Sequence, residues 1–251
     1  MTDLLGDKVV AISGVGPGLG QALARQCASA GAHVVLAART ASYVEELAKE
    51  LDGMAVPLDV TAPDAGASLL AAYGRVDTLV HNAFAMPSMR ELSKVDTASL
   101  VEGFEVNVFA ALRLTQQLAP ALVESRGSVV FVNSAVLRHS RRTFGAYKMT
   151  KAALLAVAQS LSTELGPKGV RVNSIAPSYI WSEKLEQYFA FLAQKRGVTP
   201  ETVYDEAAAN VDLRRLLTPA EIADVVVFLA SDLARGITGQ CIDVNGGEFH
   251  R

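Results

Sequence analysis

The chain has 251 residues, of which 50% are hydrophobic, and its 23 basic and 26 acidic side chains give a formal net charge of −3. Nucleic-acid binding depends on clustered Lys and Arg, so this balance predicts no nucleic-acid partner. The longest apolar runs fall far short of the ~20 residues that cross a bilayer, and the first residues carry no basic-then-apolar leader. We therefore expect a cytoplasmic protein without membrane contact. Cys27 and Cys241 have no spaced Cys or His partners and predict no metal site.

Apolar, β-branched runs bounded by Gly, Asn or Asp alternate with longer segments that carry apolar residues at helical spacing. The predicted strands are Lys8 to Ser13, His33 to Ala38, Met54 to Leu58, Val76 to His81, Ser128 to Asn133, Val170 to Ile175 and Gln240 to Val244. Strands of this kind favour a parallel sheet covered on both faces, because each crossover returns over one face. No repeat or linker divides the sequence, so we predict one doubly wound α/β domain over residues 1–251.

A glycine-rich turn joins the first predicted strand to the first predicted helix. It contains Gly14, Gly16, Gly18, Leu19 and Gly20. Glycines allow the backbone to approach a pyrophosphate closely, and the amino terminus of the helix offers unpaired N–H groups and a positive dipole end. The alternative is a tight turn without a ligand. The position between a first strand and a first helix favours dinucleotide binding.

The second predicted strand ends at Arg39 and Thr40, where a cofactor without a 2′-phosphate commonly finds an Asp or Glu for its ribose. Arg39 instead offers a forked cation suited to phosphate oxygens, with Thr40 as a second donor. We therefore expect NADP(H) to be favoured. NAD(H) is the alternative, because the glycine turn adds no basic residue and a lone Arg is often solvated.

Four polar residues stand at predicted strand ends or on predicted helices. Tyr147 and Lys151 are four residues apart on a helix, so their side chains share a face. Ser134 ends a strand 13 residues before Tyr147, and Asn107 lies 27 residues before Ser134. Each residue alone has a structural explanation, such as a cap or a backbone hydrogen bond. Together they indicate a catalytic cleft.

The order and spacing of these residues resemble the short-chain dehydrogenase/reductase family, of the classical type, over nearly the whole chain. The resemblance extends to Asp59-Val60, Asn82-Ala83, the loop that contains Pro177, Ile180 and Ser182, and the carboxyl-terminal Asp243-Val244-Asn245-Gly246-Gly247. It implies a Rossmann-type sheet of seven parallel strands in the order 3-2-1-4-5-6-7, with helices on both faces. It also implies that the glycine turn, the residues after these strands, Tyr147 and Lys151 bind the cofactor.

Reduction of a ketone requires a hydride on carbon and a proton on oxygen. Tyr147 is the predicted general acid and, in the reverse direction, the general base. An ammonium group at ~4 Å is expected to lower the phenol pKa from about 10 toward ~7, a role that Lys151 fits. Ser134 is predicted to hydrogen-bond the substrate oxygen. The family resemblance further implies that Lys151 holds the nicotinamide ribose and that Asn107 anchors a water that relays protons to Lys151.

Four residues depart from the family pattern. His81 stands where a second Asn is usual, and Phe84 stands where Gly is usual, which places a ring near the adenosine ribose or the neighbouring turn. Ser178 stands where Gly is usual. Ser182 replaces the Thr that commonly binds the carboxamide, and it keeps the hydroxyl group.

The segment 182–215 corresponds to the variable substrate lid of the family. It carries Leu185, Tyr188, Phe189, Phe191 and Leu192 at helical spacing, close to Tyr179 and Trp181. These side chains predict an apolar, aromatic-lined pocket. Packing of the lid against the body of the protein or a neighbouring subunit is an equal alternative.

A basic cluster, Arg138, His139, Arg141 and Arg142, lies between Ser134 and Tyr147. A solvated face is the favoured interpretation, and attraction of an anionic substrate is the alternative.

The features together predict an NADP(H)-preferring oxidoreductase that interconverts a secondary alcohol and a ketone on a hydrophobic or aromatic small molecule. The alternatives are a 3-oxoacyl-thioester reductase and a non-catalytic dinucleotide-binding sensor or scaffold. Apolar residues such as Phe109 and Leu155 on further helix faces predict subunit contacts. The resemblance implies a homotetramer, with a homodimer as the smaller possibility.

Overall fold

The computed structural model describes residues 3–250, in which seven parallel strands form one sheet with the order β3-β2-β1-β4-β5-β6-β7. The strands are β1 (Val9–Ser13), β2 (His33–Ala38), β3 (Met54–Pro57), β4 (Thr78–His81), β5 (Ser128–Val132), β6 (Arg171–Pro177) and β7 (Cys241–Val244). The predicted sheet and its strand order are confirmed, and each predicted strand agrees with the observed one to within two residues.

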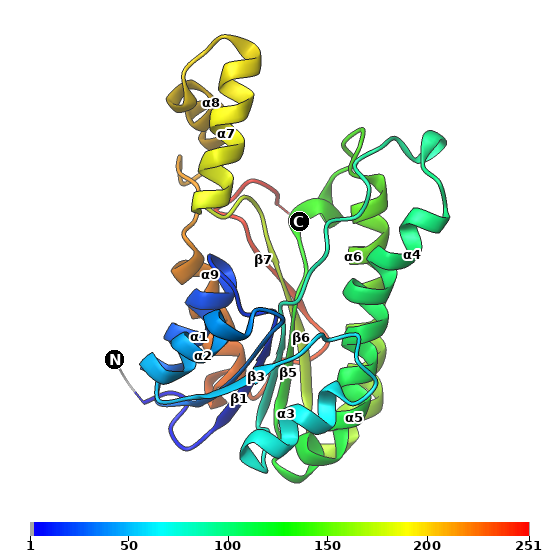
Figure 1. The fold of residues 1–251 in the computed structure, drawn as a ribbon, viewed down its shortest axis with the longest axis vertical. Helices are drawn as coiled ribbons and strands as arrows, with labels where there is room; N and C mark the ends of the chain where they lie inside the picture. The colour runs from blue at the N-terminus through cyan, green and yellow to red at the C-terminus, as the bar shows by residue number, and fades with distance from the viewer. Residues whose placement is uncertain (1–2, 251) are drawn as a thin grey trace.

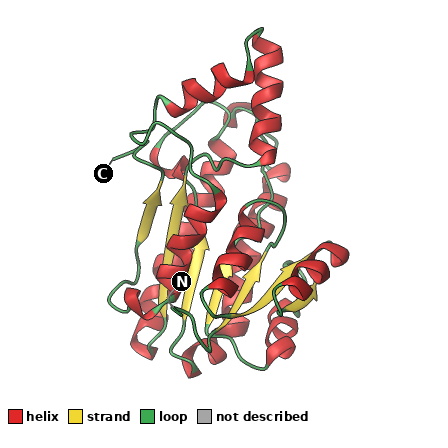
Figure 2. Ribbon diagram, turned by 90° about the vertical axis from the view of Figure 1, so that its left-hand side faces the viewer, coloured by secondary structure: helices red, strands yellow, loops and turns green. Residues whose placement is uncertain are grey.

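Helices cover both faces of the sheet (Figure 1). They are α1 (Leu19–Ser29), α2 (Ala41–Glu50), α3 (Ala65–Tyr73), α4 (Ala98–Phe104), α5 (Ala110–Glu124), α6 (Gly145–Leu165), α7 (Glu183–Arg196), α8 (Pro200–Ala208) and α9 (Pro219–Ala230). Helices α1, α2 and α9 lie on one side, and α3, α5 and α6 lie on the other. Figure 2, turned by 90°, shows the strands rising between these layers.

Alternation along the strands explains why both faces are covered. In β1, Val10 and Ile12 belong to an apolar core completed by α1, α2 and α9, while Val9 and Ala11 belong to a second core completed by α3, α5 and α6. Since successive side chains point to opposite faces, a strand buried on both sides reads as a continuous apolar run. The carboxyl ends of β1, β4, β5 and β6 consequently meet at one edge of the sheet.

Helices α7 and α8 lie beyond this edge (Figure 1) and have an apolar cluster of their own. Phe189 is only 2% exposed, and the Trp181 ring lies 4.7 Å from the Tyr204 ring. Tyr188 and Phe191 stay exposed at 45% and 59%. Packing within the predicted lid therefore accounts for Phe189 and Trp181.

Candidate active site

A cleft of about 650 Å³ opens at the carboxyl edge of the sheet. Its lining includes fifteen of the residues predicted from the sequence: Gly14, Gly16, Leu19, Gly20, Arg39, Thr40, Asp59, Val60, Asn82, Ala83, Ser134, Tyr147, Lys151, Pro177 and Ile180. Segments that are far apart in the sequence thus meet at one place. Gly18 and Ser182 do not line the cleft but are neighbours, because a Cβ atom at Gly18 would lie 3.9 Å from the Cβ of Ser182.

The glycine turn is tightly packed at two of its glycines and open at a third. Gly14 has φ +78°, and a Cβ atom there would lie 2.3 Å from the Cα of Ala83. A Cβ at Gly20 would lie 2.7 Å from the carbonyl oxygen of Gly14, so neither position accommodates a side chain. A Cβ at Gly16 would meet nothing within 4 Å, which leaves the backbone there open. No side chain caps α1, and the backbone N of Gln21 donates to the carbonyl oxygen of Gly16 at 2.9 Å. The N–H groups of Leu19 and Gly20 make no such bond within the described residues, so they remain for an anion such as a pyrophosphate.

Two predicted cofactor residues lie at the ends of β2 and β3. The exposed guanidinium of Arg39 makes no hydrogen bond or salt bridge within residues 3–250. Asp59 accepts hydrogen bonds from the backbone N of Thr61 at 2.9 Å and from its Oγ1 at 2.7 Å. These bonds, and to a smaller extent the charge of Arg39, lower the pKa of Asp59. Arg39 is therefore a cation that is available to bind an anion.

Ser134, Tyr147 and Lys151 lie together in the cleft. Ser134 follows β5, and Tyr147 and Lys151 lie in the first turns of α6. Lys151 is 4% exposed. Its Nζ donates to the carbonyl oxygen of Val132 at 2.7 Å and lies 5.9 Å from the centroid of the Tyr147 ring.

Burial controls the protonation of this pair. It raises the pKa of Tyr147 above its ordinary value of 10.0, and a hydrogen bond with Ser134 opposes the rise. Burial also lowers the pKa of Lys151 to about 7. The expectation that Lys151 draws the Tyr147 pKa toward neutrality is wrong for the protein alone, since desolvation disfavours the charged form of both groups. A phenol with a raised pKa keeps its proton at neutral pH and suits the role of a proton donor.

Asn107 lies in a π-helical turn between α4 and α5. Its Oδ1 accepts from the backbone N of Ala85 at 2.9 Å, and its Nδ2 donates to the carbonyl oxygen of Ala85 at 2.8 Å. The side chain thereby fixes the loop that follows β4. Asn107 lines a small void beside the main cleft rather than the cleft itself.

Phe84 lies next to the catalytic candidates, in the same cleft as the glycine turn. Its ring centroid is 5.4 Å from that of Tyr147 in an edge-to-face arrangement, and the Nζ of Lys151 lies 5.4 Å from the Phe84 ring centroid. Strands β4 and β5 are paired neighbours, so the chain that leaves β4 passes in front of the start of α6. Phe84, which stands where the family usually has Gly, therefore forms an apolar wall beside Tyr147.

The basic cluster is neutralised by acidic residues from elsewhere in the chain. Arg138 has a side chain only 5% exposed, and its Nε donates to both carboxylate oxygens of Asp243 at 2.9 and 3.0 Å. Arg142, in contrast, is 81% exposed and pairs with Glu91 at 2.6 Å. The solvated-face interpretation is therefore wrong for Arg138, because β7 brings an acidic partner over it.

Several residues that line the cleft were not predicted from the sequence, among them Asn133, Lys184 and Glu102. Asn133 is 2% exposed, and neither its Nδ2 nor its Oδ1 has a hydrogen-bond partner in the described structure. A polar residue directly after a buried strand and before Ser134 was the available signal. Lys184 lies in the first turn of α7 and adds a cation to the cleft.

Two features of other functional classes are absent from the described part of the chain. No helix among residues 3–250 is both long and apolar enough to cross a membrane. No group of three or more His, Cys, Asp or Glu side chains in these residues is arranged to hold a metal ion.

Comparison with known families agrees with the geometry of the cleft. The family model described as enoyl-(acyl carrier protein) reductase matches residues 14–248. The chain belongs to the short-chain dehydrogenase/reductase family. As a member of that family, the protein is an NAD(P)-dependent oxidoreductase that acts on an alcohol or a carbonyl group.

Relatives within this short-chain dehydrogenase/reductase family act on different substrates. L-rhamnose 1-dehydrogenase (NAD(P)(+)) from Azotobacter vinelandii is 34% identical over 269 residues, which cover 98% of both chains. The 7alpha-hydroxysteroid dehydrogenase from Escherichia coli is 30% identical over 260 residues, which cover 97% of this chain and 94% of the relative. The structure of L-sorbose reductase from Gluconobacter frateurii, complexed with NADPH and L-sorbose, matches with a TM-score of 0.92 and 27% identity over 100% of both chains.

Proposed function

We propose that the protein reduces a ketone to a secondary alcohol, and catalyses the reverse oxidation, with NADP(H) as the preferred cofactor. The observation that carries this proposal is the meeting of Ser134, Tyr147 and Lys151 in one cleft with the glycine turn. A sensor or scaffold that only binds dinucleotide has no use for this set of proton-transfer groups.

Each member of the set has a role in the proposed reaction. When bound, the dinucleotide supplies the hydride. Tyr147 donates the proton to the carbonyl oxygen, and its raised pKa keeps that proton in place at neutral pH. Ser134 donates a hydrogen bond to the same oxygen, where negative charge develops. Lys151 holds the ribose next to the nicotinamide, and Asn107 contributes by fixing the loop after β4 through its two hydrogen bonds with Ala85.

The preference for NADP(H) rests on the end of β2. Arg39 and Thr40 line the cleft, and no acidic residue stands at that position to accept ribose hydroxyls. The Arg39 guanidinium has no hydrogen-bond partner in residues 3–250, so it binds a 2′-phosphate without breaking an existing hydrogen bond. We expect Arg39→Ala to lower the affinity for NADPH at least about tenfold and to leave that for NADH nearly unchanged, measured by nucleotide fluorescence titration.

The substrate class rests on the wall beside Tyr147. Phe84, Ala85 and Val106 all line the cleft, and they favour an apolar or aromatic group on the carbonyl carbon. The segment 182–215, which contributes Lys184 to the lining of the cleft, is the proposed substrate lid. A 3-oxoacyl-thioester is the less favoured substrate, because Arg138 and Arg142 are already paired with Asp243 and Glu91.

The exposed apolar residues of the outer helices indicate association of subunits. Val101 on α4 is 63% exposed, Phe109 before α5 is 46% exposed, and Met149 on α6 is 39% exposed. We expect a homotetramer, or a homodimer as its smaller form, in size-exclusion chromatography with light scattering. A monomer at micromolar concentration contradicts this expectation.

The test of the proposed reaction is NADPH consumption with a panel of aryl, cyclic and steroidal ketones and thioesters. We expect Tyr147→Phe to lower turnover about 10²- to 10⁴-fold, since the variant lacks the proton donor. The affinity of Tyr147→Phe for NADPH should stay within twofold of the parent protein, about 0.4 kcal/mol. Turnover that survives the substitution would show that Tyr147 is not the proton donor.

A further inference from the structure

The carboxyl-terminal segment folds back over the loops beside the cleft. Asn245 begins a turn in which its Oδ1 accepts from the backbone N of Gly247 at 2.8 Å and its Nδ2 donates to the carbonyl oxygen of Phe249 at 3.1 Å. Gly246 and Gly247 have φ values of +63° and +89°, which favour glycine. The turn reverses the chain and directs Glu248 toward the sheet edge, so the position of Glu248 is defined by local geometry.

Glu248 joins the loop of Ser178, which lines the cleft, to the basic segment, whose Arg141 lines a second pocket together with Phe144 and Lys148. Its Oε2 accepts a hydrogen bond from the Oγ of Ser178, which lines the cleft. Its Oε1 accepts from the Nη2 of Arg141 at 3.1 Å. The Glu248 side chain is 7% exposed, whereas the Arg141 side chain is 46% exposed. The exposed Arg141 guanidinium is therefore already bound by a buried carboxylate of the protein itself.

Surrounding contacts hold this arrangement in place. The His139 ring lies 5.5 Å from the Phe249 ring, which fastens the same turn to the basic segment. Tyr179, next to Ser178, is influenced by both charges. Burial raises the pKa of Tyr179, the charge of Arg141 lowers it, and the charge of Glu248 raises it. Arg141 and Glu248 thus lie beside the loop that enters the cleft.

We propose that Glu248 is a specificity-determining residue that fills the carboxylate-binding position of Arg141 and thereby excludes carboxylate-bearing substrates. This inference rests on the proposed carbonyl reduction. An acidic substrate has to displace Glu248 from Arg141 or approach a buried negative charge. A neutral substrate meets no such barrier.

The substitution Glu248→Gln tests the charge and keeps the shape. The amide still accepts from Arg141 and still hydrogen-bonds Ser178, but the cation of Arg141 is no longer compensated. The probes are two aryl ketones that differ only in charge, 4-acetylbenzoate and its methyl ester. We expect the ratio of kcat/KM for the acid to kcat/KM for the ester to rise about tenfold in Glu248→Gln, through a lower KM for the acid.

Two further variants separate this explanation from a general change in charge. Glu206→Gln removes the same negative charge from an exposed salt bridge with Arg196, in which Nη2 and Oε1 lie 2.7 Å apart, and should leave the ratio unchanged. The double variant Arg141→Gln/Glu248→Gln should return the ratio to that of the parent protein. If Glu248→Gln does not fold, Arg141→Gln alone serves, because the uncompensated Glu248 should lower the ratio further.

The outcomes distinguish this inference from the proposed function. A ratio within twofold of the parent value in Glu248→Gln, or a rise that persists in the double variant, overturns the role of Glu248. The proposed function is contradicted instead if the parent protein reduces neither of the two probe ketones and no member of the ketone and thioester panel.

Discussion

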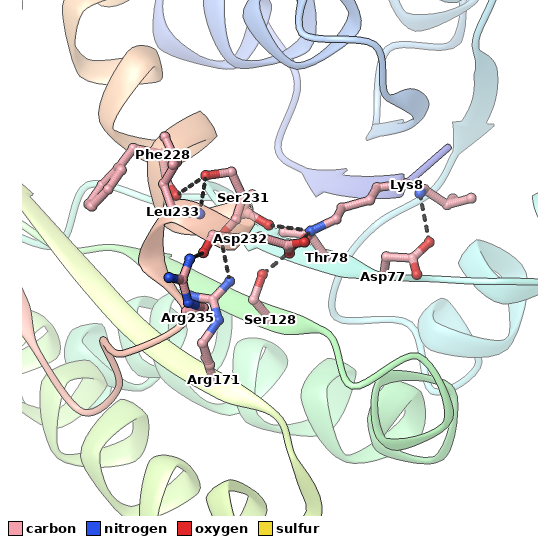
Figure 3. Close-up of polar contacts among 12 residues, drawn as sticks. Lys8, Asp77, Thr78, Ser128, Arg171, Phe228, Ser231, Asp232, Leu233 and Arg235 are labelled. Carbon is pink, nitrogen blue, oxygen red and sulfur yellow. Dashed lines mark hydrogen bonds and ion pairs between the residues drawn. The ribbon is translucent and has the colours of Figure 1, made fainter. Parts of the chain in front are cut away.

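At the amino ends of the strands, polar side chains from distant segments pair with one another, whereas at the carboxyl ends several of them face an open cleft. Figure 3 shows the first of these regions. Lys8 before β1 contacts Asp232 after α9 at 2.6 Å, and the hydroxyl groups of Thr78 and Ser128 lie 3.0 Å apart between β4 and β5. The first contact connects the start of β1 with the end of α9, and the second connects β4 with β5.

Among the described residues, the amino edge leaves one buried nitrogen, Nη1 of Arg171, without a partner, whereas the carboxyl edge leaves a whole side-chain amide unpaired. Both polar atoms of the Asn133 amide lack a partner in the described structure, and burial lowers the pKa of Lys151 to about 7. Such groups cost stability, and under the proposed function they are available to a bound substrate or cofactor. The amino edge therefore contributes to folding, and the proposed function assigns the reaction to the carboxyl edge.

The largest expected effect comes from Lys151→Met at the carboxyl edge. We expect kcat/KM to fall about 10²- to 10³-fold, because the variant lacks the amine that is proposed to hold the cofactor ribose beside Tyr147. Stability at pH 7 should rise by about 1 kcal/mol, since an unfavourably buried amine is replaced by an apolar side chain of similar length. Activity assays and urea unfolding measure the two effects. A loss of both activity and stability contradicts the division of roles between the two edges.

His81 at the end of β4 makes the stability of the carboxyl edge depend on pH. Its ring is buried, hydrogen-bonds the Oγ1 of Thr115 at 2.8 Å and stacks 4.5 Å from the Phe131 ring. Burial lowers the pKa of His81 to about 3. As the pH falls below about 6.5, the unfolded chain gains a proton that the folded protein does not accept, so stability falls by about 1.4 kcal/mol per pH unit.

The substitution His81→Asn should remove this dependence, since Asn does not titrate. We expect the free energies of unfolding of the two proteins, measured in urea, to change in parallel above pH 7 and to diverge between pH 6.5 and 4 in favour of the variant. Parallel curves throughout that range would show that His81 titrates in the folded protein as it does in the unfolded one.

Much of the fold was predictable because its signals are local. The apolar strand runs and the glycine turn each specify their own conformation, and the sheet order followed from the family resemblance. The tertiary contacts were not predictable in this way. The salt bridge of Arg138 with Asp243 joins residues 105 positions apart, and the contact of Phe84 with Tyr147 depends on how the loop after β4 is directed. The pKa of Tyr147 depends on burial, which spacing alone does not reveal.

Asp77→Ala tests the amino edge at its most buried ion pair. Asp77 is 5% exposed, its Oδ2 accepts from the backbone N of Val9 at 2.8 Å, and its Oδ1 accepts from the Nη2 of Arg75 at 2.7 Å. Removing the carboxylate leaves the Val9 N–H buried without a partner and should cost about 1–3 kcal/mol of unfolding free energy. We expect kcat to change less than twofold, or about 0.4 kcal/mol. A large loss of kcat in a folded variant would show that this edge also serves the reaction.

Lys8→Met at the same edge should have the smallest effect. The Asp232 side chain is 86% exposed, so the 2.6 Å salt bridge with Lys8 is screened by solvent although it joins segments 224 residues apart. Exposed pairs contribute roughly 0–1 kcal/mol, and we expect a loss within that range in urea unfolding, without a change in kcat. Asp77→Ala is the matched comparison, because its carboxylate is buried and also bonds the backbone. Equal losses in the two variants would mean that the connection of α9 to β1, rather than burial of the carboxylate, determines how this edge contributes to stability.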